Sequence, residues 1–179
     1  MSLDFDSARL PNPFLKPEHH EWRTQIRRFF DREIIPYAAQ WDEDGYIPDE
    51  LWPKSAAVGI LGLGYPEEFG GISEGIDGWY SIILNEEMAR IAVGGVSATL
   101  LVHGIGLPPV IKFGSEEIKQ MVAPPVLAGT KRISLAITEP GAGSDVAHLT
   151  TTARLDGDHY VVNGSKTYIT GGMNANWFT

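Results

Sequence analysis

The 179-residue sequence contains no cysteine, which excludes disulfide bonds, thiolate catalysis and cysteine-ligated metal centres. Basic residues are also scarce, because 14 Lys and Arg stand against 23 Asp and Glu, for a formal net charge of −9. A duplex-binding protein needs a dense basic surface, so we expect no nucleic-acid partner. The five histidines lack the spacing of metal ligands, and we therefore expect no metal site.

Long apolar runs are rare as well. Runs such as residues 82–84 are far shorter than the roughly 20 residues that span a bilayer, so we expect no membrane insertion. Residues 1–5 carry an aspartate and no basic residue, which predicts no secretory signal and a cytoplasmic protein.

The sequence before Gly129 shows the apolar spacing of helices. Pro17 suits the first turn of a helix that Pro36 should end near Ile34. One face of this helix carries an apolar stripe, made of Trp22, Ile26, Phe29 and Phe30.

Further helices are expected over residues 50–58 and 76–92. The apolar stretch 95–113 predicts a helix buried on most sides, which Pro108-Pro109 should bend or break. Ser115 is a good N-cap for a helix to about Val122, and Gly129 is a plausible stop.

After Gly129 the pattern changes to short strands, expected over residues 133–138, 150–155, 159–162, 166–170 and from 176. Asp156-Gly157 and Asn163-Gly164 suit tight hairpin turns, which predicts a three-stranded meander. A sheet this small with open edges is marginal alone. We therefore predict an α+β chain, with a helical domain at residues 1–129 followed by the first part of a β domain at 130–179, and we interpret it as truncated.

The most unusual stretch is residues 137–145, with the sequence ITEPGAGSD. Its glycines let the backbone approach something flat or anionic, although a polar turn is the more common explanation of an arbitrary Gly-Ala-Gly. Val146 stands where a dinucleotide-binding fingerprint needs its last glycine. Ser144 lacks the frame of a nucleophile elbow, so neither motif applies.

Four ordered segments resemble the acyl-CoA dehydrogenase family. They are residues 64–71 (GYPEEFGG), 85–90 (NEEMAR), 136–145 (AITEPGAGSD) and 156–170 (DGDHYVVNGSKTYIT). The resemblance covers nearly the whole chain. It implies an N-terminal all-α helical domain and the first strands of a β-barrel-like middle domain, with the C-terminal four-helix domain missing.

The resemblance also implies an FAD site. Residues 135–144 would contribute backbone and hydroxyl groups to the flavin edge, and residues 168–170 would form a second arm. Tyr168 stands where relatives often have Trp or Phe, and Thr170 would place a hydroxyl near the reactive ring nitrogen. Ser144 would contact substrate as well as cofactor. The implied cofactor-binding residues are Leu135, Ile137, Thr138, Gly143, Ser144, Tyr168, Ile169 and Thr170.

The implied reaction is the FAD-dependent oxidation of an acyl-CoA thioester to the 2,3-enoyl-CoA. A glutamate takes the α proton while hydride passes from the β carbon to flavin, and that glutamate belongs to a later segment than this chain contains. The resemblance further implies electron-transferring flavoprotein as acceptor, a homotetramer, and a role in fatty acid or amino acid catabolism. Gly171-Gly172 and His148 depart from the usual family pattern, beside the motif and outside its polar groups.

Three alternatives remain open at this point. An oxidase or monooxygenase relative would share the fold and differ in how reduced flavin meets oxygen. A scaffold homologue would keep the fold without the base. Among single residues, we interpret Glu139 as structural, Glu86 and Glu87 as surface residues, and His103 as either a core residue or part of an acyl tunnel.

Overall fold

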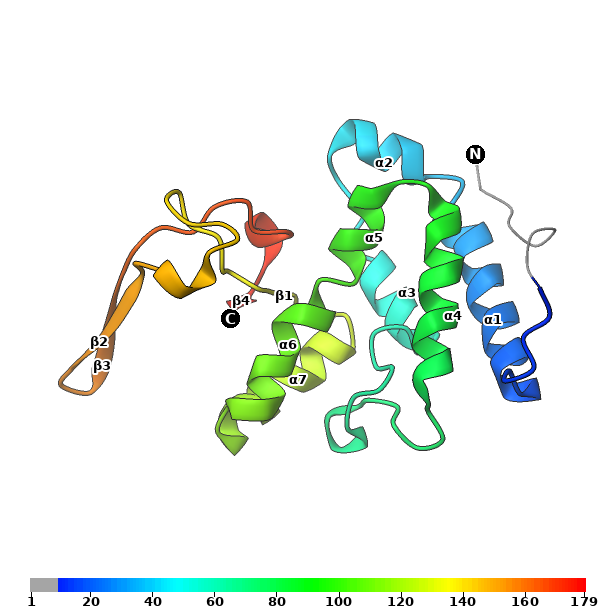
Figure 1. Cartoon of the computed structure of the whole chain (residues 1–179), viewed down its shortest axis with the longest axis horizontal. Coiled ribbons are helices and arrows are strands. Elements are labelled where there is room, and N and C mark those ends of the chain that lie inside the picture. Colours follow the sequence, from blue (N-terminus) through cyan, green and yellow to red (C-terminus); the bar gives the residue numbers. More distant parts are fainter. Residues whose placement is uncertain (1–9) are drawn as a thin grey trace.

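The computed structural model describes residues 10–179, which form a group of helices followed by a smaller part with short strands (Figure 1). The helices are α1 (Pro17–Glu33), α2 (Ala38–Asp44), α3 (Leu51–Ala57), α4 (Gly78–Met88), α5 (Gly94–Leu100), α6 (His103–Phe113) and α7 (Glu116–Leu127). The strands are β1 (Ile133–Ser134), β2 (Thr152–Asp156), β3 (His159–Asn163) and β4 (Trp177–Phe178). This arrangement confirms the predicted α+β class.

Helix α1 forms as the apolar spacing predicts. Pro17 occupies its first turn, and the side chain of His19 accepts a hydrogen bond from the backbone N–H of Lys16 over 3.0 Å. The helix ends at Glu33, three residues before Pro36. The predicted stripe is buried, with exposed fractions of 8% or less for Trp22, Ile26, Phe29 and Phe30.

Two apolar clusters hold the helical part together. In the first, α1 packs along α4, as Figure 1 shows, with Phe30 and Ile83 fully buried between them and their neighbours. The second lies where α6 and α7 meet β1, and Leu107 and Ile133 are fully buried in it. The second cluster therefore joins the helical part to the first strand.

The helices differ from the sequence-based expectation in two details. The sequence pattern did not predict α2, which is short and buries only Ala38. Of the predicted bend or break at Pro108-Pro109, the break is absent, because both prolines lie inside α6, and the chain turns at Leu101-Val102. Each proline removes one backbone donor, and the burial of Leu107 beside them offsets that loss.

The apolar stretch Gly94–Phe113 corrects another expectation. With 20 residues and a mean hydropathy of 1.4, it is long and apolar enough to cross a membrane by length and composition. In the structure the stretch is divided between α5 and α6, and 39% of its most apolar window is buried. Its buried residues Val96, Leu100 and Leu107 belong to the two clusters, whereas Ile105 and Phe113 are exposed, so only part of this stretch contributes to the core.

The strands form two separate pairs. β2 and β3 make the predicted antiparallel hairpin, in which Asp156 faces His159 and Gly157-Asp158 form the turn, one residue later than predicted. β1 and β4 pair in parallel, with Ile133 opposite Trp177. A strand opening near residue 176 is thereby confirmed.

The predicted third strand of the meander was wrong. Residues 166–170 form no strand, because the chain leaves the hairpin at Gly164 and turns toward Thr138, whose carbonyl accepts a hydrogen bond from the N–H of Thr167 over 2.9 Å. Gly164 has a φ of 155°, and a Cβ at this position would collide with Thr151. The backbone at Gly164 therefore lies against Thr151, and the chain changes direction there without forming the expected second hairpin turn.

Glu87 was predicted to lie at the surface, and this was wrong. Its side chain is fully buried between α1 and α4 and contacts three arginines. Arg27 donates two hydrogen bonds of 2.8 Å to the two carboxylate oxygens, Arg23 donates one of 2.9 Å, and Arg90 lies at 3.4 Å. The neighbouring Glu86 is partly exposed and pairs with Arg23 at 2.6 Å.

We expect Glu87→Gln to lower the free energy of unfolding by about 3 kcal/mol, because it removes the buried carboxylate that Arg23, Arg27 and Arg90 all contact. Urea unfolding followed by circular dichroism measures this loss. Glu86→Gln is the matched control and should cost less than about 1 kcal/mol, since its side chain is 41% exposed. Equal losses for the two variants would contradict the role assigned to Glu87.

Candidate functional site

The two segments that the sequence marks for ligand binding lie side by side. We call residues 135–144 the first arm, and we extend the second arm from the predicted residues 168–170 to residues 166–170. The Lys166 ammonium donates to the carbonyl of Ile137 over 2.8 Å, and the N–H of Thr167 donates to the carbonyl of Thr138. At the far end, the Ser134 hydroxyl donates to the carbonyl of Thr170 over 2.8 Å. Backbone and side-chain hydrogen bonds thus fix the second arm against the first.

A hollow of about 880 Å³ opens beside the second arm. Its size falls within the range of small-molecule and cofactor sites. Tyr168 and Met173 are 92% and 98% exposed although both are large and apolar in character. The residues that line the hollow are Ala136, Lys166, Thr167, Tyr168, Ile169, Thr170, Gly172, Met173 and Phe178. Exposed apolar side chains around a hollow of this size indicate a binding surface.

Tyr168 has an unusual backbone. Its φ is +56°, in the left-handed region that non-glycine residues rarely adopt. Holding such a conformation costs on the order of 1 kcal/mol, and residues of this kind cluster at ligand sites. The strained backbone and the exposed ring occur at the same residue, which supports a functional role for this position.

The hollow contains only part of the predicted site. Tyr168, Ile169 and Thr170 line it, and Thr170 lies in an irregular segment instead of at the predicted strand end. The predicted residues that do not line it are Leu135, Ile137, Thr138, Gly143 and Ser144. The first three are half-buried beneath the second arm, whereas Gly143 and Ser144 are exposed on the turn that follows Glu139.

Sequence reasoning missed several residues of the hollow. Met173 and Phe178 follow the second arm closely in the sequence, and Ala136 belongs to the first. One signal was available, because Met173 stands in a polar, glycine-rich segment where an apolar side chain has no neighbour to pack against. Phe178 reaches the hollow through the pairing of β4 with β1, which no local pattern indicates.

Glu139 is the polar centre of the site. It is 4% exposed, and four donors surround its carboxylate. One oxygen accepts from the N–H and the hydroxyl of Thr150, over 2.7 and 2.6 Å. The other accepts from the N–H of Thr151 and from the ammonium of Lys166, both over 2.9 Å. The carboxylate therefore ties the first arm to the start of the hairpin and to the second arm.

These contacts decide the charge of Glu139. Hydrogen bonds from Thr150 first, and then from Thr151 and Lys166, hold the pKa of this carboxyl far below its usual range. A carboxylate that is ionised and bound by four donors is a poor proton acceptor. Its placement supports the structural interpretation made from the sequence.

His103 lies in the core at the start of α6. It is 7% exposed, and its Nε2 atom lies 3.0 Å from the carbonyl oxygen of Leu61. Burial lowers the pKa of the imidazole, so the neutral form is favoured. Within residues 10–179, no three histidine, aspartate or glutamate side chains come close enough together to hold a metal ion.

Comparison with protein families matches nearly the whole described chain. Residues 16–130 match the acyl-CoA dehydrogenase N-terminal domain, and residues 134–179 match the acyl-CoA dehydrogenase middle domain. The probable acyl-CoA dehydrogenase FadE25 of Mycobacterium tuberculosis is 38% identical over 177 residues. That match covers 98% of this chain and 43% of the relative, so the chain spans less than half the length of the curated relatives that it matches.

Solved structures show the same similarity. A putative acyl-CoA dehydrogenase from Mycobacterium smegmatis is 45% identical, with a TM-score of 0.86 over 93% of this chain and 44% of that one. An acyl-CoA dehydrogenase from Bacillus anthracis, solved in complex with FAD, is 34% identical, with a TM-score of 0.84 over 94% of this chain and 29% of that one. Sequence and fold therefore point to the same family.

We expect Glu139→Gln to loosen the contact between the two arms. The pKa of Glu139 is lower in the folded chain than its ordinary value of 4.5, so its stabilising contribution is present above about pH 4.5 and is lost as the pH falls further. Urea unfolding between about pH 7 and pH 3 should show a gap between wild type and variant that narrows below about pH 4.5. The amides of Thr150 and Thr151 should also exchange faster with deuterium.

Glu117→Gln is the matched control, because Glu117 is exposed in the first turn of α7. It should leave both the unfolding curve and the exchange of these two amides almost unchanged. A gap for Glu139→Gln that stayed constant down to pH 3 would show that the ionised carboxylate is not the stabilising group.

Proposed function

The chain belongs to the acyl-CoA dehydrogenase family, and from this premise we propose that it forms one wall of the flavin site in an FAD-dependent acyl-CoA dehydrogenase. The proposed reaction is the oxidation of an acyl-CoA thioester to the 2,3-enoyl-CoA. The observation that carries the proposal is the hollow beside the second arm, where an exposed aromatic ring, a strained backbone and a free hydroxyl group come together.

The residues of the hollow suit a flavin. The exposed ring of Tyr168 offers a flat apolar surface, and Met173 and Phe178 extend it. Thr170 offers an exposed hydroxyl, which favours a ligand that accumulates negative charge, whereas the charge of Lys166 is already paired with Glu139. When bound, FAD supplies the hydride acceptor of the reaction.

The chain's own residues have distinct proposed roles. Tyr168 shields the reacting region from water, and Thr170 orients the cofactor edge through its hydroxyl. Ser144, exposed on the turn after Glu139, is free to contact both substrate and cofactor. We propose that four further residues contribute to cofactor binding mainly through the backbone. Three of them are half-buried in the first arm and the fourth lies on the same turn as Ser144; they are Leu135, Ile137, Thr138 and Gly143.

We propose that the base that takes the α proton lies outside residues 1–179. The one buried acid of the site, Glu139, is held ionised by four donors. The chain matches only 43% of the length of FadE25, which leaves more than half of such a protein for the base and the opposite wall of the site.

The proposed partners follow from the relatives. A chain in a structure described as the electron-transferring flavoprotein of Acidaminococcus fermentans is 30% identical, with a TM-score of 0.83. Together with family membership, this supports electron-transferring flavoprotein as the acceptor. We further propose a homotetramer that acts in the cytoplasm, in fatty acid or amino acid catabolism.

We expect the 179-residue chain alone to show no dehydrogenase activity, because it lacks both a base and the opposite wall of the site. An assay with straight and branched acyl-CoA substrates and an artificial electron acceptor measures this. The full-length protein should purify yellow and as an oligomer. Turnover by the 179-residue chain above a heat-inactivated sample would contradict this assignment, as would a colourless full-length monomer that takes up no FAD.

In the full-length enzyme, Thr170→Val should make the flavin potential more negative by roughly 10–30 mV, because a hydrogen bond to the reduced cofactor is worth about 0.5–1.5 kcal/mol. Reduction by substrate should slow by a few-fold up to about tenfold. The melting temperature should hardly change, because valine keeps the shape of threonine. Spectroelectrochemistry, stopped-flow absorbance and differential scanning calorimetry measure the three quantities.

Thr152→Val serves as the matched control, since Thr152 is exposed on β2 and does not line the hollow. It should leave the potential and the reduction rate at wild-type values. If Thr170→Val behaved in the same way, its role at the flavin would be wrong. A large loss of stability for Thr170→Val would instead identify it as a structural residue.

A further inference from the structure

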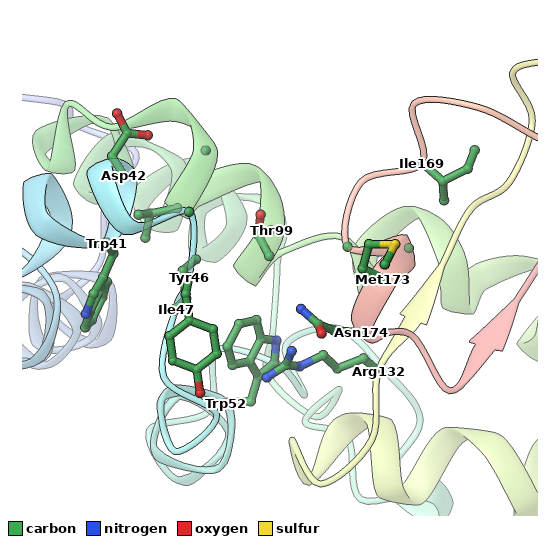
Figure 2. Close-up of a pocket in the computed structure, with 15 residues that line it drawn as sticks. Trp41, Asp42, Tyr46, Ile47, Trp52, Thr99, Arg132, Ile169, Met173 and Asn174 are labelled. Carbon is green, nitrogen blue, oxygen red and sulfur yellow. The ribbon is translucent and has the colours of Figure 1, made fainter.

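A second pocket lies between the helical part and the segment that follows the second arm. We call it the seam pocket; its volume is about 290 Å³ (Figure 2). Trp41, Tyr46 and Trp52 come from the helical part, and Figure 2 shows Ile169, Met173 and Asn174 on the opposite side. The remaining lining residues are Asp42, Gly45, Ile47, Gly95, Val96, Thr99, Arg132, Gly171 and Gly172.

The seam pocket is adjacent to the flavin hollow. Ile169, Gly172 and Met173 line both spaces, so the wall between them is only a few residues thick. At Gly171, with a φ of +70°, the chain turns from one space to the other. A ligand whose reacting end lies in the hollow therefore has a second compartment directly beside it.

Aromatic rings form one side of the seam pocket. The Trp41 ring stacks on Tyr37, with their centroids 5.8 Å apart, and this contact holds the Trp41 ring in place. Trp52 is 4% exposed, and the Arg132 guanidinium lies 3.6 Å from the centre of its ring. Tyr46 is 54% exposed and free to contact a ligand. The Trp52 ring is covered, so the exposed ring of Tyr46 is the surface of this side that favours a flat partner.

Polar side chains form much of the rest. Asp42, Thr99 and Asn174 bring hydrogen-bonding groups to the lining. Arg132 brings a charge that Asp49 already pairs at 2.5 Å. A straight saturated chain would bury these groups without offering them a hydrogen bond, which is unfavourable. A ring that carries a hydroxyl or a carbonyl would satisfy them.

We propose that the seam pocket binds the far end of the acyl group and selects acyl-CoA thioesters whose acyl group ends in a ring with a polar substituent. The inference rests on the proposed function, because it requires the thioester end to react at the flavin hollow. It adds a substrate class and two specificity-determining residues, Tyr46 and Asn174. Tyr46 contacts the face of the ring, and Asn174 hydrogen-bonds the substituent.

The test uses the full-length, FAD-loaded enzyme and two substrates of similar length. These are 5-(4-hydroxyphenyl)pentanoyl-CoA, which ends in a polar ring, and nonanoyl-CoA, which is straight and saturated. For wild type, kcat/KM should be about tenfold higher with the ring substrate. Tyr46→Ala and Asn174→Ala should each lower that preference about three- to tenfold, with nonanoyl-CoA almost unaffected.

Binding is measured independently of turnover. The CoA thioethers of the same two chains lack the carbonyl that acidifies the α proton, so they bind without being oxidised. Isothermal titration calorimetry should give a lower Kd for the ring thioether in wild type and lose that difference in both variants. Tyr160→Ala is the matched control, because Tyr160 is 67% exposed on β3 and does not line the seam pocket.

The outcomes separate this inference from the proposed function. If nonanoyl-CoA reduces the flavin but wild type shows no preference for the ring substrate, the inference is wrong and the proposed function stands. A preference that Tyr46→Ala and Asn174→Ala leave unchanged, as Tyr160→Ala does, also overturns the inference. If neither thioester reduces the flavin, the proposed function fails, and the inference fails with it.

Discussion

The carboxylate of Glu139 is the single group on which the arrangement of the site depends. Two of its donors come from the start of the hairpin at Thr150 and Thr151, and a third is the ammonium of Lys166 in the second arm. Three separate segments are thus held by one charge. Lys166 also reaches the carbonyl of Ile137, so the same side chain fixes the backbone of the first arm. Because the carboxylate is buried and ionised, removing Lys166 would leave a buried charge without its counter-charge, so the three segments depend on one another.

Each half of the chain contains one buried glutamate whose carboxylate accepts several hydrogen bonds. In the helical part, Glu87 contacts three arginines between α1 and α4, beside the apolar cluster that contains Ile83. In the strand part, every residue of β2 and almost every residue of β3 is exposed, so few apolar residues are buried there. The hydrogen bonds to Glu139 lie in this part of the chain. Burial of apolar surface stabilises the helices, whereas hydrogen bonds to one carboxylate organise the loops that line the hollow.

Local patterns predicted local structure well. The spacing of Trp22, Ile26 and Phe30 was enough to place α1, and Asp156-Gly157 was enough to place the hairpin. The errors arise where distant segments decide the outcome. Glu87 is buried because α1 covers α4, a contact between residues about 60 positions apart. Likewise, residues 166–170 have the composition of a strand but bind the first arm, almost 30 positions earlier. The membership of Phe178 in the hollow depends on a parallel pairing that no short sequence window records.

That parallel pairing also sets an order of assembly. Thr179 donates its hydroxyl to the carbonyl of Gly106, 73 positions away, and its own carbonyl accepts from the N–H of Ala136. Beyond Leu127, the two clusters of the helical part include Ile133 in their buried set and Trp177 at the edge, so most of the helical part can form on the ribosome while the later residues are still being added. The hollow has no wall at Phe178 until the polypeptide has grown to that residue and folded back. The hollow is therefore completed on a helical scaffold that has already formed, and its last wall depends on a contact that only the folded-back chain can make.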